Sequence, residues 1–183
     1  MKGWHMGELF RLADKIVADR VVSIQQAYSA INRSAELEVL PFCARHNLAF
    51  MAYNPLAGGL LTGKYGTPED NPLVESTAEP TEYAPRLQQF DMYRKRYYDP
   101  QAARIATAFA DYARDRGNSP AQLALAWVSG DPRVTTPILG ARNLDQLTDT
   151  MGGLEITLTP EERAAIPAAR PGRWFGKDPV YDR

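Results

Sequence analysis

Three short apolar runs, separated by segments with helical periodicity, most constrain how this 183-residue chain folds. The runs are Val21–Ile24, Leu48–Tyr53 and Val134–Leu139. They are largely continuous rather than alternating with polar residues, which is typical of strands buried on both faces of a parallel sheet. Strands that alternate with helices in this way predict an α/β fold.

Helix-start signals lie between and after these runs. Asp99 and Ser119 are each followed by proline, so each side chain is placed to cap a helix that has proline at its first position. Asn143 and Thr159 begin two further predicted helices. In the helix after Asp99, the spacing predicts an apolar face formed by Ile105, Ala108, Phe109 and Tyr112.

Two features indicate that these units belong to a larger fold. Three parallel strands are too few to close a barrel, which needs eight, and too few for a typical doubly wound sheet. The segment between Asn54 and Asp99 has little helical period. It is far longer than the roughly 12–15 residues of most structureless connections, so a lid or binding loop is expected there.

Composition and charge exclude several classes of function. The chain has 21 Lys and Arg against 22 Asp and Glu, a net charge of -1, which argues against a nucleic-acid or membrane partner. The only cysteine, Cys43, has no intrachain disulfide partner, so a cytoplasmic location is expected. His5 and His46 are isolated, and we expect no metal site. The first twenty residues lack the apolar core of a signal peptide, and no stretch is apolar enough to span a bilayer.

Polar and aromatic residues occur where the predicted strands end. Gln25 offers both a donor and an acceptor, which suits a carboxamide ligand, and Tyr53 offers a flat face for stacking. Arg142 precedes a predicted helix N-terminus, a common arrangement for phosphate binding. Each also has a simpler explanation: Gln25 as a partner for backbone groups, Tyr53 as a core residue, and Arg142 as a solvated surface charge.

Four ordered blocks of the sequence resemble aldo-keto reductases. Ser23–Ser29, followed by Ile31–Arg33, is similar to the family's sixth-strand signature. Ala52–Tyr65 resembles the block at the seventh strand, and Ser119–Trp127 and Pro137–Leu147 resemble the last two units. The resemblance covers nearly the whole chain and is nearest to the bacterial and potassium-channel β-subunit-like branch.

This resemblance implies the C-terminal part of a (β/α)8 TIM barrel, about three βα units plus extra helices. Residues 1–183 would form one partial NADP-dependent oxidoreductase domain, with a long cofactor or substrate loop over residues 66–98. In the family, NADPH is the cofactor, and small aldehydes and ketones are reduced to alcohols.

The resemblance also assigns cofactor-binding positions. Gln25 falls where the family binds the nicotinamide carboxamide, and Tyr53 where an aromatic ring stacks on nicotinamide. The loop over the diphosphate corresponds to Asn54, Pro55, Leu56, Gly58 and Lys64. The positions around the adenosine 2′-phosphate correspond to Gly140, Arg142, Gln146 and Asp149, and Arg86 corresponds to a loop arginine that reaches the adenosine end. Asn54 replaces the usual serine, and Asp149 with Thr150 replaces a usual Glu-Asn pair at the adenine.

The family's catalytic Asp, Tyr, Lys and His lie on the first four βα units and have no counterpart here. We therefore expect no catalytic residue in this chain and almost no activity from it alone. Two alternatives to an enzyme piece stay open. In the first, the chain is a non-catalytic half-barrel that binds NADP or docks to a partner such as the missing N-terminal half. In the second, the chain is a half-barrel that pairs with a second copy of itself. The sequence does not specify the carbonyl substrate.

Overall fold

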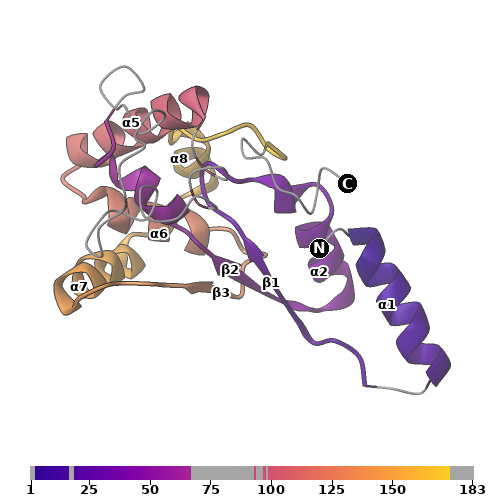
Figure 1. Cartoon of the computed structure of the whole chain (residues 1–183). Coiled ribbons are helices and arrows are strands. Elements are labelled where there is room, and N and C mark those ends of the chain that lie inside the picture. The colour runs from indigo at the N-terminus through magenta and orange to yellow at the C-terminus, as the bar shows by residue number, and fades with distance from the viewer. Residues whose placement is uncertain (1–2, 17–18, 67–92, 94–96, 98, 174–183) are drawn as a thin grey trace, which may run out of the picture.

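The computed structural model describes residues 3–16, 19–66, 93, 97 and 99–173. Its centre is a three-stranded parallel sheet in the order β1-β2-β3, formed by β1 (Ser23–Ala27), β2 (Ala49–Tyr53) and β3 (Thr136–Ile138). Helices α1 and α2 lie at one end of the molecule, and α5 to α8 gather at the other (Figure 1). The predicted α/β fold with parallel strands is confirmed, and the sheet agrees with part of a (β/α)8 barrel.

The helical elements follow in chain order. α1 (Gly3–Ile16) precedes the sheet, and η1 (Ser34–Glu36) with α2 (Val39–His46) connects β1 to β2. After β2 come η2 (Ala57–Thr62), α5 (Pro100–Asp115) and α6 (Pro120–Ser129). The chain continues after β3 with α7 (Leu144–Met151), η4 (Gly152–Glu155) and α8 (Pro160–Ala165).

The first strand differs from its prediction. It begins at Ser23 rather than Val21 and continues through Gln25 and Gln26 to Ala27. The β-branched residues predicted a strand in this region but not its limits. Pairing with β2 sets those limits, since the paired residues run from Ser23 with Ala49 to Ala27 with Tyr53. Gln25 therefore lies inside the strand rather than beyond its end.

All four predicted helix caps are confirmed. Asp99 accepts hydrogen bonds from the first turn of α5, Asn143 caps α7, and Ser119 and Thr159 each form a capping box. The predicted apolar face of α5 is wrong in part, because Ala108 is exposed and Ile105 and Tyr112 are only partly buried. Around Phe109, the helix instead buries small residues that allow close packing: Ala102, Ala103, Ala106, Ala110 and Ala113.

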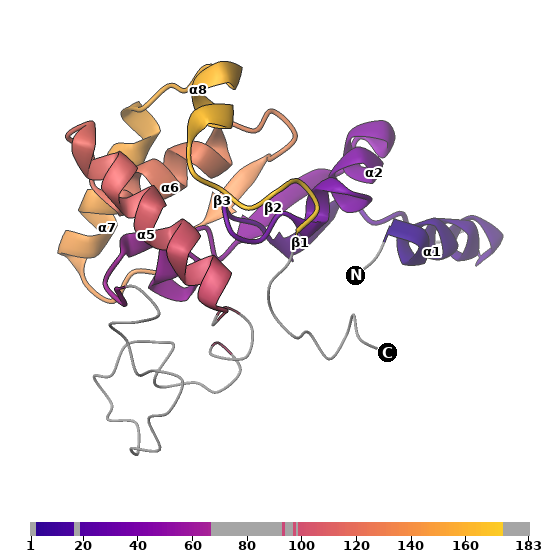
Figure 2. The ribbon, with the colours of Figure 1, turned by 90° about the horizontal axis from the view of Figure 1, so that it is seen from above.

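The core is centred on α6, which is apolar around most of its circumference, with residues Leu123 to Val128 all buried. Trp127 on this helix lies against Tyr28, with ring centroids 5.4 Å apart, and Tyr28 contacts Phe50 of β2 edge-on. Helix α6 packs against α5, α7 and β3, and the view from above shows these helices gathered on one side of the sheet (Figure 2). This packing fixes the carboxyl end of the sheet relative to the helices that follow it.

A buried ionic cluster adjoins Trp127. The Asp131 carboxylate, 1% exposed, accepts hydrogen bonds from Arg133 at 2.7 Å and from the Tyr28 hydroxyl at 2.9 Å. Arg163 of α8 donates to the Tyr28 hydroxyl at 2.8 Å and to the backbone carbonyl of Trp127 at 2.9 Å. The cluster thereby joins the end of β1, the end of α6 and helix α8.

Both outer strands have an open edge in the described part of the chain. β1 and β3 each pair only with β2. Near β1, helix α1 exposes a stripe of apolar side chains, and beyond β3 a second exposed stripe runs along α7 and η4. The α1 stripe consists of Leu9, Leu12 and Ile16, and the α7–η4 stripe of Leu144, Leu147, Met151 and Leu154. Open parallel edges flanked by apolar helix faces are what a section cut from a closed barrel presents.

Candidate functional site

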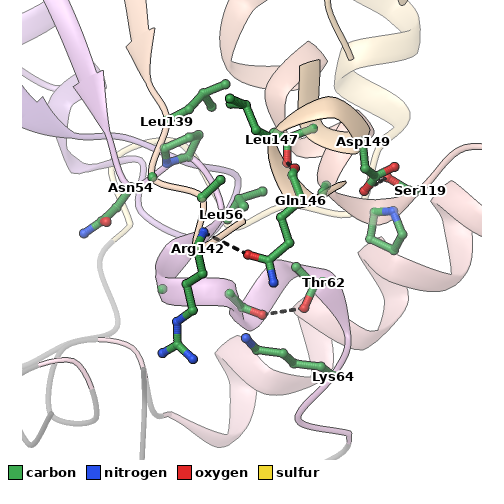
Figure 3. A pocket seen from close by; sticks show the side chains of 18 of the residues that line it. Asn54, Leu56, Thr62, Lys64, Ser119, Leu139, Arg142, Gln146, Leu147 and Asp149 are labelled. Carbon is green, nitrogen blue, oxygen red and sulfur yellow. Dashed lines mark hydrogen bonds between the residues drawn. The ribbon is translucent and has the colours of Figure 1, made fainter. Parts of the chain in front are cut away.

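A pocket opens where β2 and β3 end, at the carboxyl edge of the sheet. Its volume is about 330 Å³, and its walls are the segment from Asn54 to Lys64, the first turn of α6, the residues that follow β3, and α7. Figure 3 shows these walls converging on one hollow. Ligands of parallel α/β folds bind at this edge because the loops that leave the strands meet there.

Most of the predicted cofactor-binding residues line this pocket. Those contributed after β2 are Asn54, Pro55, Leu56, Gly58 and Lys64. Those contributed after β3 and by α7 are Gly140, Arg142, Gln146 and Asp149. The fold thus brings together two groups that are about 80 positions apart in the sequence.

The wall after β2 has an unusual backbone. Asn54 and Ala57 adopt positive φ angles of 56° and 50°, and Gly58 and Gly59 follow with 68° and 91°. Glycine suits position 59 because a φ of 91° strains other residues. A Cβ added there would lie 2.8 Å from the Lys64 ammonium, the flexible end of a side chain that can move aside. The Lys64 side chain therefore packs directly over the Gly59 backbone. The Thr62 hydroxyl donates to the Gly59 carbonyl at 2.8 Å and holds this turn closed (Figure 3).

The opposite wall is the start of α7. The Asn143 side chain accepts from the Gln146 backbone N–H at 2.9 Å, and the Gln146 side chain accepts from the Arg142 backbone N–H at 3.2 Å. These two bonds fix the direction in which the chain enters the helix. The N-terminus of α7, with its partial positive charge, therefore lies at the pocket wall immediately after Arg142.

Charge is distributed unevenly in the pocket. The Arg142 and Lys64 side chains extend to the same side of the hollow, whereas Asp149 lies on the other side, beside Ser119 (Figure 3). The Ser119 hydroxyl donates to the Asp149 carboxylate at 2.9 Å and also accepts from the Gln122 backbone N–H at 3.1 Å. Two cations and a helix N-terminus suit an anionic group such as phosphate, and the carboxylate suits a hydrogen-bond donor at the other end.

Gln25 and Tyr53 lie next to this pocket rather than in its lining. Along β1 and β2, Gln25 is aligned with Met51, and Tyr53 is two residues further along. The alternation of side chains places Gln25 and Tyr53 on the same face of the sheet, as diagonal neighbours. This face is not the one that carries the buried residues Ile24 and Phe50. Since Asn54 follows Tyr53 directly, the face and the pocket are continuous.

One predicted position lies outside the pocket description, and several lining residues were not predicted. Arg86 lies outside the described residues. Thr62 and Ser119 were missed as pocket residues, and the hydroxyl of Ser119 was explained by helix capping alone. The apolar lining residues Ile138, Leu139 and Leu147 were also missed, although the position of the first two at the end of β3 was an available signal.

Two other features bear on the class of site. Within the described ranges, no group of three His, Cys, Asp or Glu side chains is placed to hold a metal ion. Of the helices in those ranges, none has the length and hydropathy that crossing a membrane requires.

Comparison with known proteins gives a consistent result. The sequence model of the aldo/keto reductase family matches residues 5–170. An uncharacterized oxidoreductase, YrpG of Bacillus subtilis (strain 168), is 35% identical over 159 residues, which are 87% of this chain and 43% of that protein. Protein tas of Escherichia coli (strain K12) is 35% identical over 157 residues, 86% of this chain and 42% of that protein.

A further relative has a cofactor in its name. The aldo-keto reductase yakc [NADP(+)] of Schizosaccharomyces pombe (strain 972 / ATCC 24843) is 29% identical over 142 residues, 76% of this chain and 38% of that protein. The chain thus spans about two fifths of the length of the relatives it matches.

Proposed function

Because the chain belongs to the aldo/keto reductase family, we propose that it binds NADPH along the carboxyl edge of its sheet, as the cofactor-binding part of a carbonyl-reducing barrel. The observation that carries the proposal is the convergence of Arg142, Lys64 and the N-terminus of α7 on one pocket beside the strand ends. A pocket of about 330 Å³ accommodates only part of a dinucleotide. The phosphate-bearing adenosine end would occupy it, and the other end would extend over the sheet.

The residues present fit the phosphate groups of this cofactor. The glycine turn at Gly58 and Gly59 allows close approach of the ligand to the backbone, and Lys64 lies directly above it. Arg142 presents a planar fork of donors suited to a phosphate, beside the N-terminus of α7. These features support NADPH rather than NADH, because the 2′-phosphate is the group that distinguishes the two. The name of the S. pombe relative agrees with this preference.

The other end of the cofactor would lie on the open face of the sheet. Tyr53 would stack on the nicotinamide ring, and the Gln25 amide would hold its carboxamide. Bound NADPH supplies the hydride for reduction of an aldehyde or ketone. What this chain supplies is the orientation of the ring, since Gln25 and Tyr53 are fixed in neighbouring paired strands. The proton donor would come from another part of the barrel, since the family resemblance assigns no catalytic acid to these residues.

The direct test is calorimetric titration of the purified chain with NADPH and with NADH. We expect saturable binding of NADPH that is at least tenfold tighter than that of NADH, and no oxidation of bound NADPH by simple aldehydes. Equal affinity for the two cofactors, or no binding to a folded chain, would refute the proposed site. Carbonyl reduction by the chain alone would contradict the proposal that the proton donor comes from another part of the barrel.

A second function is favoured by the open edges: the chain docks to the complementary part of an aldo/keto reductase barrel. A strand added at the edge of β1 would pair in parallel, and the helix that precedes this strand in the barrel would cover the α1 stripe. The side chains that such contact would bury include Leu12, 49% exposed, and Ile16, 73% exposed.

We expect a stable one-to-one complex when the chain is mixed with a polypeptide containing the first five strands of the B. subtilis relative and the four helices between them, which completes the eight strands of the barrel. Light scattering after size-exclusion chromatography measures the mass. Leu12→Lys should prevent the complex, whereas Leu37→Lys, at an exposed leucine outside both stripes, should not. A stable dimer of the chain alone that Leu12→Lys dissociates would show that a second copy covers this surface instead.

A further inference from the structure

The segment after β2 is held by a tyrosine from a distant part of the chain. The Asn54 side-chain amide donates a hydrogen bond to the Tyr97 hydroxyl at 3.1 Å. Tyr97 is 1% exposed, and its ring lies 6.0 Å from that of Tyr93. Because a buried ring has little freedom, its hydroxyl is a fixed point for the Asn54 side chain.

Asn54 needs such a fixed point because its backbone is in the left-handed region, with φ at 56°. This conformation is unfavourable for most residues, and asparagine is one of the few that adopt it readily. The asparagine therefore serves the backbone turn and the side-chain hydrogen bond at once. Serine, the residue that the family resemblance leads one to expect here, has a shorter side chain and no amide N–H.

The orientation of Asn54 determines the wall of the pocket through a series of turns. The Asn54 carbonyl accepts from the Ala57 N–H at 2.9 Å, and the Leu56 carbonyl accepts from the Gly59 N–H at 2.9 Å. The Gly59 carbonyl then accepts from the Thr62 hydroxyl at 2.8 Å. A rotation of the backbone at Asn54 would therefore displace the glycine turn over which Lys64 packs.

We propose that Tyr97 is a positioning residue for the cofactor pocket: its hydroxyl fixes Asn54 and thereby holds residues 55–59 in the conformation that binds the ligand. Tyr97 does not line the pocket itself. The proposal rests on the proposed function for the identity of the ligand, NADPH, but its effect on the backbone does not require a ligand. If Tyr97 acts through Asn54, its hydroxyl should influence the pocket only while residue 54 donates a hydrogen bond to it.

Two measurements on the full chain test the proposal. Tyr97→Phe removes only the hydroxyl, and Tyr112→Phe, on α5 outside the pocket, is the matched control. Hydrogen exchange of the unliganded chain, followed by mass spectrometry, should show several-fold faster exchange over residues 55–62 in Tyr97→Phe alone. The dissociation constant for NADPH should rise about fivefold, the effect of losing one net hydrogen bond.

A double-mutant cycle separates positioning from general destabilisation. Tyr97→Phe should have little further effect on either measurement when introduced into Asn54→Ser, because the hydrogen bond is already absent. An unchanged exchange rate in Tyr97→Phe, or an equal effect in both backgrounds, would overturn the proposal. Faster exchange in Tyr97→Phe, combined with a wild-type chain that does not bind NADPH, would sustain the positioning role and refute the proposed function.

Discussion

Replacement of Arg142 by alanine is expected to weaken NADPH binding by roughly 10- to 100-fold and NADH binding much less, the range for losing hydrogen bonds to a charged group. Arg142 is the last residue before the cap of α7, and its side chain extends into the space shared with Lys64 (Figure 3). The ligand group that it contacts in the proposed function is the 2′-phosphate, which NADH lacks. Isothermal titration calorimetry with both cofactors measures the two losses separately.

Arg45→Ala is the matched control for this prediction. Arg45 lies in the last turn of α2, is exposed, and does not line the pocket. This variant should bind both cofactors as the unmodified chain does. If Arg142→Ala weakened NADPH and NADH by the same factor, Arg142 would act on a part common to both cofactors. The assignment of the 2′-phosphate to this wall would then be wrong.

Replacement of Asp131 by alanine is expected to lower the free energy of unfolding by about 3–5 kcal/mol, the usual cost of removing one partner of a buried ion pair. The loss would leave Arg133 and Arg163 without their shared carboxylate, at 2.7 Å and 3.3 Å in the intact cluster. The Tyr28 hydroxyl would also lose its hydrogen bond to that carboxylate. Urea unfolding followed by circular dichroism measures the change.

Asp111→Ala provides the comparison, since Asp111 is also paired with an arginine, Arg114, at 2.9 Å. Both side chains of that pair are more than half exposed, so the substitution should cost less than about 1 kcal/mol. A similar cost for the two variants would show that the Asp131 cluster contributes no more than a surface ion pair.

The same cluster should make stability depend on acid pH. Burial disfavours the charged form of Asp131, but the hydrogen bonds from Arg133 outweigh burial and lower its pKa from 3.8 to about 2. Because the pKa is lower in the folded state, the carboxylate's stabilising contribution is fully present above pH 3.8 and is lost as the pH falls toward 2. The stability difference between the unmodified chain and Asp131→Ala should therefore shrink over that interval.

Local sequence signals accounted for the first residues of four helices and for much of the pocket. Asp99, Ser119, Asn143 and Thr159 cap the helices that they were expected to cap, because capping involves only residues within three or four positions. The glycine turn after β2 could be assigned to the pocket by resemblance, since a conformation with positive φ restricts the residue types allowed.

Signals that depend on distant partners were misread or not seen. The face buried by α5 consists mainly of alanines around Phe109, with Ile105 and Tyr112 only partly buried and Ala108 exposed, because close contact with neighbouring elements decides which side is covered. The limits of β1 follow its pairing with β2. The hydrogen bond between the Asn54 and Tyr97 side chains joins residues 43 positions apart, so no local sequence pattern predicts it.

The sequence by itself determined the order of strands and helices, the helix caps and the residue types available at the strand ends, since each of these depends on neighbours along the chain. Only the tertiary structure decided that Lys64 and Arg142 share one pocket, that Gln25 and Tyr53 lie on the adjoining face, and that Asp131 is buried among arginines. The physical reason is that parallel pairing and helix packing bring together residues far apart in sequence, and such contacts leave no periodic signal in the chain.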